Sequence, residues 1–430
     1  MHLLRRFVPL ALLLSAASLT VFSCKGTSTP RPGNPDEGAS GGTTSGVGGS
    51  PALGGSTSFG GQPSVDVCGE APDTSADFTK ATLLAAVSSC SAHVACVFQN
   101  AAGDLNRTVG EWADDPNEQS LARARAAFAA AMDAWSMMEG FQFGPLADVS
   151  NDKYHGRGLR ALVHPWPNTN RCNVETQIAL REYETADGFM YVPASGRGLY
   201  AIEYVLFSDF PDTVCAANQA ATQAWNALSA DELAEARRDY ARAVAGDVVG
   251  LADQLVGVWS VDGEDFASVL ANHEGYGSEQ EALNVVAWAL MYPESEIKDW
   301  KLGPRSTIPA TPAPFGPENP YAQVGIQNIR TNLLAFQALY SGCRAGTGVG
   351  FDDWLGAVGA TELRDDIDAA LTAAISAFAA APPVESATVA QIDELYQAIK
   401  PLSDLLKSSF FGSGSPLNLK LPDSAASDTD

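Results

Sequence analysis

The hydrophobic and polar positions between about residues 73 and 407 follow the pattern of helices. Ala-rich, helix-forming segments dominate this region, and no convincing series of alternating positions indicates strands. Groups of Gly, Pro and Asn indicate breaks at residues 168–170, 210–212, 302–304 and 381–383. Helices are expected at residues 76–101, 117–141, 174–185, 197–208, 217–228, 230–258, 278–300, 322–342, 360–380 and 387–409.

This pattern predicts an all-α protein built as two packed helical bundles. A helical region of about 350 residues is larger than one compact bundle usually is. We therefore expect an N-terminal bundle at residues 68–215, a C-terminal bundle at 216–412 and a disordered tail at 413–430. No tandem repeat is strong enough to show that the two halves are related.

The first residues have the composition of an export signal. Two arginines precede an apolar stretch, residues 7–21, which is too short to span a membrane. Residues 21–24, Val-Phe-Ser-Cys, resemble a bacterial lipobox. We therefore expect a lipoprotein signal peptide at residues 1–23 and a lipid on Cys24, which becomes the first residue of the mature chain. An ordinary secretory signal with a coincidental Cys is the alternative.

Residues 24–67 are expected to form a disordered tether. Of the 43 residues from Lys25 to Val67, 29 are Gly, Ser, Thr or Pro, a composition that cannot bury enough apolar surface to fold. The tether would connect the folded part to a lipid bilayer. Lys25 stands where an Asp retains lipoproteins in the inner membrane of well-studied bacteria. The expected location is therefore the cell envelope, at the outer membrane facing the periplasm, and exposure on the cell surface stays open.

The net charge argues against a nucleic-acid partner. The chain carries a formal charge of −25, and loss of Arg5 and Arg6 with the signal leaves 24 basic against 51 acidic residues, or −27. A footprint on phosphates needs a basic surface. The acidity serves solubility or favours cations.

The cysteines that remain after Cys24 indicate disulfides. An even number in an exported protein predicts up to three bonds, with the pairing left open. Cys90 and Cys96 lie about 9 Å apart if they share one continuous helix, so they cannot pair with each other. The six are Cys68, Cys90, Cys96, Cys172, Cys215 and Cys343.

Two carboxylates are expected inside the protein. Glu203 lies in the middle of the apolar run Leu199–Phe207. A buried ionised carboxylate costs several kcal/mol unless it is paired, bound to a metal or protonated. Glu139 falls on the apolar face of the helix at 117–141, within an arc of about 60° that holds Leu121, Phe128, Met132 and Trp135. The alternative is that Glu139, in the last turn, bends to solvent or pairs with an Arg.

Three segments resemble the imelysin-like family in their order and spacing. They are residues 134–145, with Ala-Trp and Phe-Gly-Pro; residues 163–167, Val-His-Pro-Trp-Pro; and residues 198–207, which follow the family signature Gly-x-His-x-x-Glu. The resemblance covers about residues 75–410. Segments in the second half that are also similar to the family lie at residues 278–284, 298–304, 318–321 and 328–333.

The resemblance implies two packed helical bundles, with the signature helix contributing to a site near their interface. Family members are exported, often lipid-anchored, and linked to iron regulation or metal uptake, and the founding member was described as a peptidase. Gly198 and Glu203 match the signature, but Tyr200 stands at the position of the His. An imidazole binds divalent transition metals well, whereas a phenol binds poorly unless it is deprotonated, typically by ferric iron.

The candidate ligand-binding residues are Glu139, His164, Gly198, Tyr200 and Glu203. Tyr200 and Glu203 are the candidate metal ligands, and no catalytic residue is assigned. These two residues share one helix face, so a phenol-to-carboxylate hydrogen bond in a core is the alternative. His164 is placed near the site, and a structural role in its turn is the alternative.

The first functional hypothesis is a non-catalytic periplasmic lipoprotein that binds a metal ion, a metal complex or a partner in iron acquisition. The implied cofactor is an iron ion or another divalent or trivalent metal ion, and the implied partners are the bilayer and a metal-uptake protein. A metallopeptidase is the second hypothesis; the missing signature His and the lack of a His-Glu-x-x-His helix argue against it. A scaffold whose former site has become core packing is the third.

Overall fold

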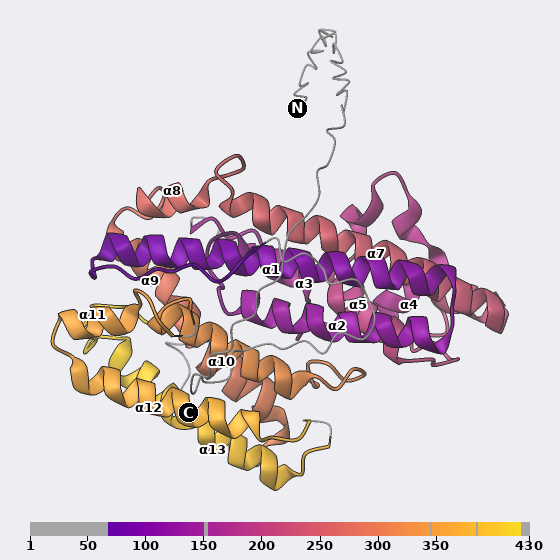
Figure 1. The fold of residues 1–430 in the computed structure, drawn as a ribbon. Helices are drawn as coiled ribbons and strands as arrows, with labels where there is room; N and C mark the ends of the chain where they lie inside the picture. Colours follow the sequence, from indigo (N-terminus) through magenta and orange to yellow (C-terminus); the bar gives the residue numbers. More distant parts are fainter. Residues whose placement is uncertain (1–67, 150–153, 345, 384–385, 423–430) are drawn as a thin grey trace, which may run out of the picture. The chain divides into compact units, whose positions relative to one another are not determined.

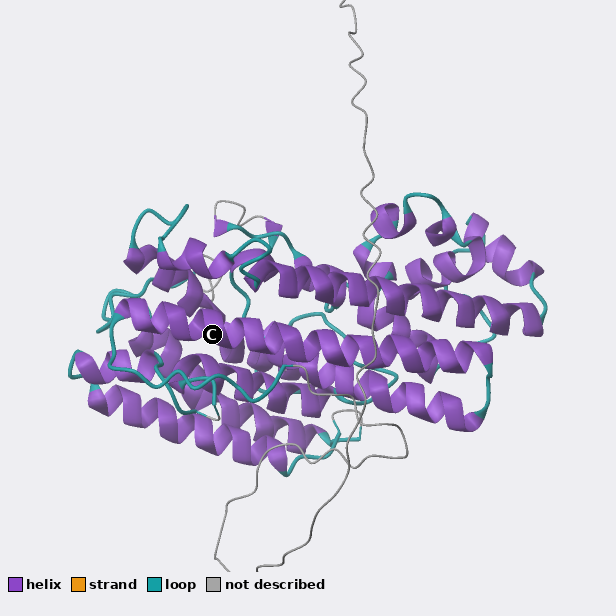
Figure 2. Ribbon diagram, turned by 45° about the horizontal axis from the view of Figure 1, so that its top comes forward, coloured by secondary structure: helices purple, strands orange, loops and turns teal. Residues whose placement is uncertain are grey.

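The computed structural model describes residues 68–149, 154–344, 346–383 and 386–422. The expected signal peptide, Cys24 and the tether lie outside these residues. All regular structure in the described ranges is helical, which confirms the all-α prediction (Figures 1 and 2). The α-helices are α1 (Lys80–Asp114), α2 (Glu118–Glu139), α3 (Leu159–Val163), α4 (Arg171–Leu180), α5 (Gly198–Phe207), α6 (Ala220–Ala227), α7 (Ala230–Trp259), α8 (Phe266–Ala271), α9 (Glu279–Trp288), α10 (Gly325–Ser341), α11 (Phe351–Ala357), α12 (Thr361–Ala379) and α13 (Val389–Leu405).

The sequence pattern locates the long helices well and misses the short ones. Helices α3, α8 and α11, of 5, 6 and 7 residues, are absent from the expected set, because so few residues show no clear periodicity. The expected helix at 278–300 is divided into α9, a short 3-10 turn and the π-helical segment Pro293–Leu302 (η7). Helix α1 continues past its expected end at residue 101 as far as Asp114.

Several long helices begin at capping residues that the sequence displays. The side chains of Thr79, Asn117 and Ser229 accept hydrogen bonds from the backbone amides of Thr82, Ser120 and Glu232, at the starts of α1, α2 and α7. These bonds satisfy amides that have no partner inside the helix, so they fix where each helix starts.

The helices pack in two groups (Figure 1). Helix α1 packs along α2 and α7, and α5 packs on α7 and α2. In the second group, α12 packs against α13 and α10, and η7 packs against α13. Helix α10 also packs along α2 and so joins the groups. Helix α7 packs with the first group, although it follows the boundary expected between residues 215 and 216. That boundary stays a prediction.

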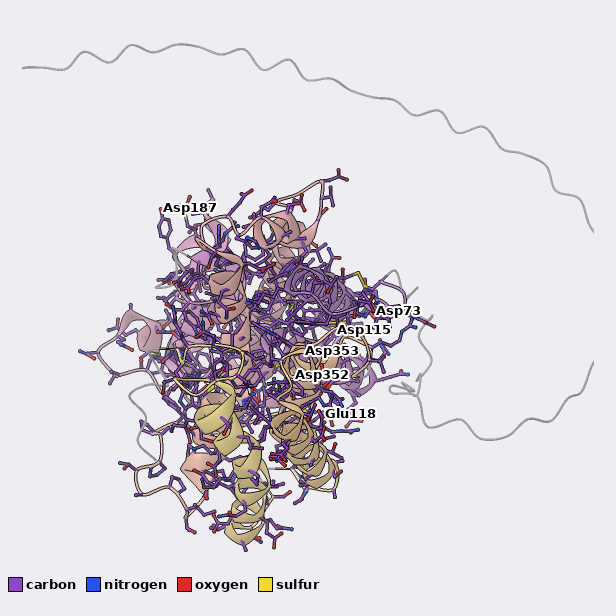
Figure 3. All side chains as sticks on the ribbon, turned by 90° about the vertical axis from the view of Figure 1, so that its left-hand side faces the viewer. Asp73, Asp115, Glu118, Asp187, Asp352 and Asp353 are labelled. Carbon is purple, nitrogen blue, oxygen red and sulfur yellow. A yellow bond between two sulfur atoms is a disulfide. The ribbon has the colours of Figure 1, made fainter. Side chains whose placement is uncertain are left out.

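Helix α1 is a core helix of the first group. Among the described residues it is the one helix long and apolar enough to cross a membrane. Leu83, Phe98 and Leu105 of this helix are at most 1% exposed. Its composition therefore reflects burial between α2 and α7. Of the acidic residues labelled in Figure 3, Asp352 is half-buried and the others are exposed: Asp73, Asp115, Glu118, Asp187 and Asp353.

The six cysteines form three disulfides, as expected. The bonds join Cys68 to Cys96, Cys90 to Cys343 and Cys172 to Cys215. Cys90 and Cys96 both lie on α1 and bond to other parts of the chain, as their spacing requires. The Cys90–Cys343 bond connects α1 to the end of α10.

The expectation of a disordered tail from residue 413 is wrong for residues 413–422. Leu417 and Leu419 are 2% and 1% exposed. The indole of Trp288 donates a hydrogen bond to the carbonyl of Lys420, and the amide of Gln280 donates to that of Leu417. The two leucines cover apolar surface beside α9, so this segment belongs to the core; residues 423–430 lie outside the described ranges.

Candidate functional site

Glu139 ends α2 as a fully buried carboxylate, as its helical position predicted, and it also pairs with an Arg, Arg160, which was part of the alternative. Its Oε1 accepts a hydrogen bond of 3.0 Å from Arg160 Nε, and its Oε2 accepts one of 2.7 Å from the Tyr292 hydroxyl. Burial alone would raise the pKa of Glu139, but the positive charges of Arg160 and Lys301 lower the pKa to about 2. The side chain is therefore an anion at neutral pH.

His164 follows α3 and is 0% exposed. Neither of its ring nitrogens has a hydrogen-bond partner among the described residues. Burial lowers the pKa of His164 to about 3, with Lys301 and Arg160 acting in the same direction and Glu139 opposing them. The imidazole is therefore neutral and keeps a lone pair for a ligand.

Glu318 comes from a loop of the second half of the chain, between η7 and α10. Its Oε1 accepts a hydrogen bond of 2.8 Å from Lys301 Nζ, and its Oε2 accepts one of 3.0 Å from the side-chain amide of Asn328. Burial raises the pKa of Glu318, and Lys301 opposes this shift. The His164 Nδ1 lies 3.9 Å from Glu318 Oε1.

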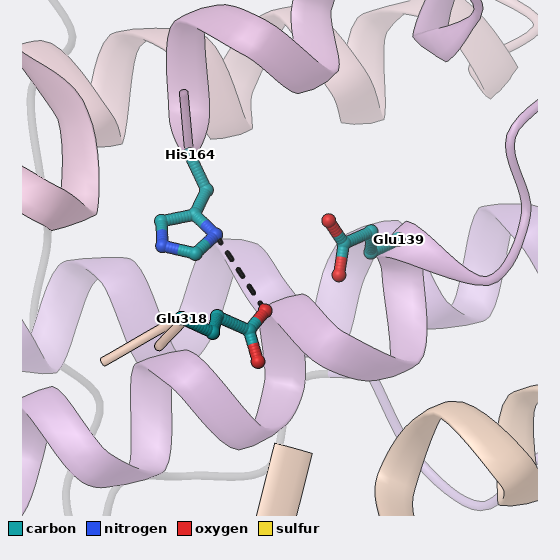
Figure 4. A group of neighbouring side chains, drawn as sticks. All are labelled: Glu139, His164 and Glu318. Atoms are coloured by element: carbon teal, nitrogen blue, oxygen red, sulfur yellow. Dashed lines mark ion pairs between the residues drawn. The ribbon is translucent and has the colours of Figure 1, made fainter. Parts of the chain in front are cut away.

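These three side chains form a group that could hold a metal ion. One ligand atom of each of Glu139, His164 and Glu318 lies within 4.8 Å of the others. Figure 4 shows the imidazole pointing at the Glu318 carboxylate, with the Glu139 carboxylate facing the same space. Two ligands of one ion lie up to about 4.2 Å apart at bond lengths of about 2.1 Å. One imidazole and two carboxylates are donors that suit zinc, ferrous iron or manganese, so the group could hold such an ion if its ligand atoms draw slightly closer together.

Lys301 places a positive charge at the same group. Its ammonium lies 2.8 Å from Glu318 Oε1, 2.8 Å from Asn332 Oδ1 and 3.7 Å from Glu139 Oε2. Together with Arg160 it balances the two carboxylates, so the cluster is paired without a metal. A metal ion at this position therefore competes with the lysine for Glu318.

Glu203 is fully buried, as its apolar run predicted, but it does not lie in the metal-capable group. Its Oε1 accepts hydrogen bonds of 2.9 Å from the backbone amides of Tyr321 and Ala322, and its Oε2 accepts one of 3.1 Å from the Asn319 side chain. Burial raises the pKa of Glu203 to about 7, against the three hydrogen bonds, which lower it. Glu203 thus holds the loop that carries Glu318.

A chain of amides connects Glu203 to the group. Asn319 donates to Glu203, and Asn328 donates both to Asn319 Oδ1, at 2.6 Å, and to Glu318 Oε2, at 3.0 Å. Each amide is fixed by the next, so the position of Glu318 depends on the signature helix α5. A metal-ligand role for Glu203 and Tyr200 stays a prediction.

Tyr200 is 5% exposed, with Tyr321 and Thr169 close to its phenol. Burial raises the pKa of its phenol, and the neighbouring Tyr321 adds to this shift. The alternative interpretation was a hydrogen bond from the Tyr200 phenol to the Glu203 carboxylate. The carboxylate instead accepts its hydrogen bonds from Asn319 and from two backbone amides.

Gly198 begins α5 at a position where only glycine fits. Its φ is +68°, and a Cβ there would lie 2.3 Å from the carbonyl oxygen of Val163. The close approach brings α5 against the residue that precedes His164. Gly198 therefore acts on the site through the backbone.

Of the predicted site residues, the structure brings Glu139 and His164 together and adds Glu318, Lys301 and Arg160. Sequence reasoning missed these three as site members. Glu318 and Lys301 do lie in the segments 318–321 and 298–304 that resemble the family, which was the available signal. Arg160 had no such signal, because a single Arg in a short helix is usually exposed.

The comparisons with known proteins agree with this architecture. A family model described as imelysin, peptidase M75, matches residues 96–407. No curated protein matches the chain.

Two solved structures share the fold. An imelysin-like protein from Psychrobacter arcticum 273-4 has a TM-score of 0.57 at 15% identity, over 78% of this chain and 96% of that one. A protein described as a putative iron-regulated protein A precursor, from Parabacteroides distasonis ATCC 8503, has a TM-score of 0.55 at 18% identity, over 78% of this chain and 95% of that one. Because the family model spans well over half of the sequence, the chain belongs to the imelysin family.

Proposed function

We propose that this imelysin-family protein is a non-catalytic envelope protein that binds one divalent metal ion through Glu139, His164 and Glu318. The observation that carries the proposal is the His164 ring, which is 0% exposed and has no hydrogen-bond partner among the described residues on either nitrogen. A buried polar group without a partner costs about 1 to 3 kcal/mol. A metal ion bound between the imidazole and the two carboxylates removes that cost.

Ferrous iron is the ion we propose first. The donors are one nitrogen and carboxylate oxygens, without a thiolate, a set that suits ferrous iron, manganese and zinc better than copper(I). The Parabacteroides protein that shares the fold is described as iron-regulated, which supports iron for this chain. A metal-uptake protein is the partner that such a binding protein would serve.

The proposed compartment is the cell envelope, with Cys24 lipid-anchored in the outer membrane and the folded part facing the periplasm. Three disulfides in the described residues support an oxidising compartment. The Parabacteroides neighbour is described as a precursor, which fits processing at the signal of residues 1–23. The mature chain then begins with the tether that carries the folded part away from the lipid surface.

The burial of the group argues against a peptidase. Glu139 and His164 are 0% exposed and Glu318 is 4% exposed. A metallopeptidase needs a metal with an open position that a polypeptide can reach. The geometry therefore supports binding of an ion and not hydrolysis of a peptide.

The test is metal binding by the mature chain carrying Cys24→Ser, which removes the lipid. Anaerobic titration calorimetry with ferrous iron, manganese and zinc should show one saturable site. His164→Gln should reduce the affinity at least 100-fold, whereas His155→Gln, at a half-buried histidine outside the group, should leave it unchanged. Absence of saturable binding in the parent, or equal binding by His164→Gln, would overturn the proposal.

A further inference from the structure

A cavity lies at the C-terminal end of α5, away from the carboxylate group. It occupies about 730 Å³ between the last turn of α5, residues 208–211, the start of α7 and the facing sides of α1 and α2. Cavities of about 300 to 1,000 Å³ accommodate small organic ligands. None of Glu139, His164, Lys301 or Glu318 lines it.

Four aromatic side chains line this cavity, beside aliphatic and polar ones. They are Trp112 of α1, Phe207 of α5, Phe210 and Trp225. Trp225 is 2% exposed and donates its indole N–H to the carbonyl of Pro211 at 2.8 Å, which fixes the ring. These faces would receive the apolar part of a ligand.

Three arginines line the same cavity against one acidic residue. Arg125, Arg237 and Arg238 line it together with Asp209, a local balance of 3 − 1 = +2 in a chain whose net charge is −25. A positive cavity in an acidic protein attracts an anion and repels the cations that the rest of the surface attracts.

The arginines are only partly used by the protein. Arg125 Nε donates to the carbonyl of Leu206 at 2.7 Å, and Arg237 Nη2 donates to the carbonyl of Ser208, so both also cap the end of α5. Arg237 is 8% exposed, and its Nη1 has no hydrogen-bond partner among the described residues. Half-buried Arg238 forms no ion pair with another described residue, so its guanidinium is available.

We infer that this cavity binds a small organic carboxylate with an aromatic or alkyl body. The guanidinium of Arg238 pairs with the carboxylate, a geometry in which two N–H groups meet two oxygens. The aromatic walls take the body of the ligand. An inorganic anion would leave those walls unused, and a neutral hydrophobic compound would leave the guanidinium unused.

The test uses the mature chain carrying Cys24→Ser and three carboxylates, 1-naphthoate, 3-phenylpropionate and decanoate. Trp112 and Trp225 line the cavity, so their fluorescence reports occupancy. At least one carboxylate should bind saturably with one-to-one stoichiometry, and its neutral alcohol analogue should bind at least tenfold more weakly. Lack of saturable binding by all three carboxylates, or equal binding of acid and alcohol, would overturn the inference.

Variants locate the binding. Arg238→Gln should weaken the carboxylate at least fivefold, and Ala234→Phe, which places a ring in the cavity, should block it. Arg242→Gln is the matched control, because Arg242 lies one turn further along α7, outside the cavity, and pairs with Asp114. Binding unchanged in Arg238→Gln and in Ala234→Phe would place the ligand elsewhere and refute the site. Circular dichroism checks that each variant is folded.

Discussion

At the scale of single residues, the site is defined by a competition between cations. Lys301 holds its ammonium 2.8 Å from Glu318 and 3.7 Å from Glu139. Removing one member of a buried ion pair typically costs about 3 to 5 kcal/mol, because the remaining charge is left without a partner. The lysine therefore stabilises the protein without metal and weakens the binding of metal.

Lys301→Met should separate these two effects. The variant should unfold at a lower temperature than the parent without metal, because Glu318 loses its counter-charge. Saturating ferrous iron should then raise its melting temperature more than it raises that of the parent. Lys400→Met is the control, since Lys400 pairs with Asp404 on the surface. Equal metal-induced shifts in Lys301→Met and the parent would contradict a competition at this position.

Glu203→Gln tests whether the signature carboxylate positions the loop or binds the ion. The pKa of Glu203 is raised to about 7, above its ordinary value of 4.5, so the folded state holds its proton more tightly than the unfolded state. Its contribution to stability is thus fully present below about pH 4.5 and is lost as the pH rises through about 7, by roughly 3 kcal/mol at most.

Urea unfolding at pH 4.5, 6 and 7.5 measures this dependence. The difference in unfolding free energy between the parent and Glu203→Gln should change over that interval. Asp393→Asn should show no comparable change, because hydrogen bonds from Ser306 and Thr307 lower the pKa of Asp393, which therefore lies below the interval. Iron stoichiometry should stay at one in Glu203→Gln. Loss of the bound ion with an unchanged fold would instead make Glu203 a ligand.

The burial of Glu139 and Glu203 could be predicted because helical periodicity and an apolar run are local signals. The role of Glu318 could not, because it lies in a loop whose path depends on hydrogen bonds to Glu203, more than a hundred residues earlier. His164 was placed near the site by its neighbours, but its unpartnered nitrogens follow from the packing of several distant segments.

At the scale of elements, Gly198 determines how α5 meets the segment that carries His164. The positive φ costs a non-glycine residue about 1 kcal/mol or more. The contact of a Cβ with the Val163 carbonyl, at 2.3 Å, adds a steric cost that only a shift of α5 relieves. The sequence marked Gly198 through the signature, and the structure supplies the reason for it.

Gly198→Ala should therefore destabilise the protein by about 2 to 4 kcal/mol, the backbone strain and the overlap together. Gly188→Ala measures the backbone strain alone, because Gly188 also has a positive φ, +53°, but no atom lies within 4 Å of a Cβ added there. Urea unfolding compares the two. If both variants lose the same free energy of unfolding, the close contact of the added Cβ with Val163 carries no cost.

Packing between elements explains where the predicted ends of helices and of the folded region were wrong. Helix α1 passes Gly103 and Gly110 without a break, because its contacts with α2 and α7 continue there and outweigh the weak helix propensity of glycine. The Ser, Gly and Pro residues of the tail at 413–422 are typical of loops and favour disorder, yet Leu417 and Leu419 are buried. Tertiary contacts decided both cases, and no local pattern displays them.

At the scale of the whole molecule, the site joins the two groups of helices. Glu139 and His164 come from the first group, whereas Lys301 lies in η7 and Glu318 in the loop before α10. The Cys90–Cys343 disulfide makes the same connection covalently, with a sequence separation of 253 between its cysteines, against 28 for Cys68–Cys96. The chain-entropy model gives the longer loop an advantage of about 2 kcal/mol.

Replacing Cys90 and Cys343 together by Ala should thus lower the urea midpoint more than the same replacement of Cys68 and Cys96. Both changes remove one disulfide, so the second pair is the matched control for the loss of the sulfurs. A bound ion would also connect the two groups of helices. Iron should then stabilise the Cys90/Cys343 variant more than the Cys68/Cys96 variant, because the first variant has lost its covalent connection between the groups. Midpoints measured with and without iron give both comparisons, and equal midpoints for the two double variants would show that the long connection adds nothing.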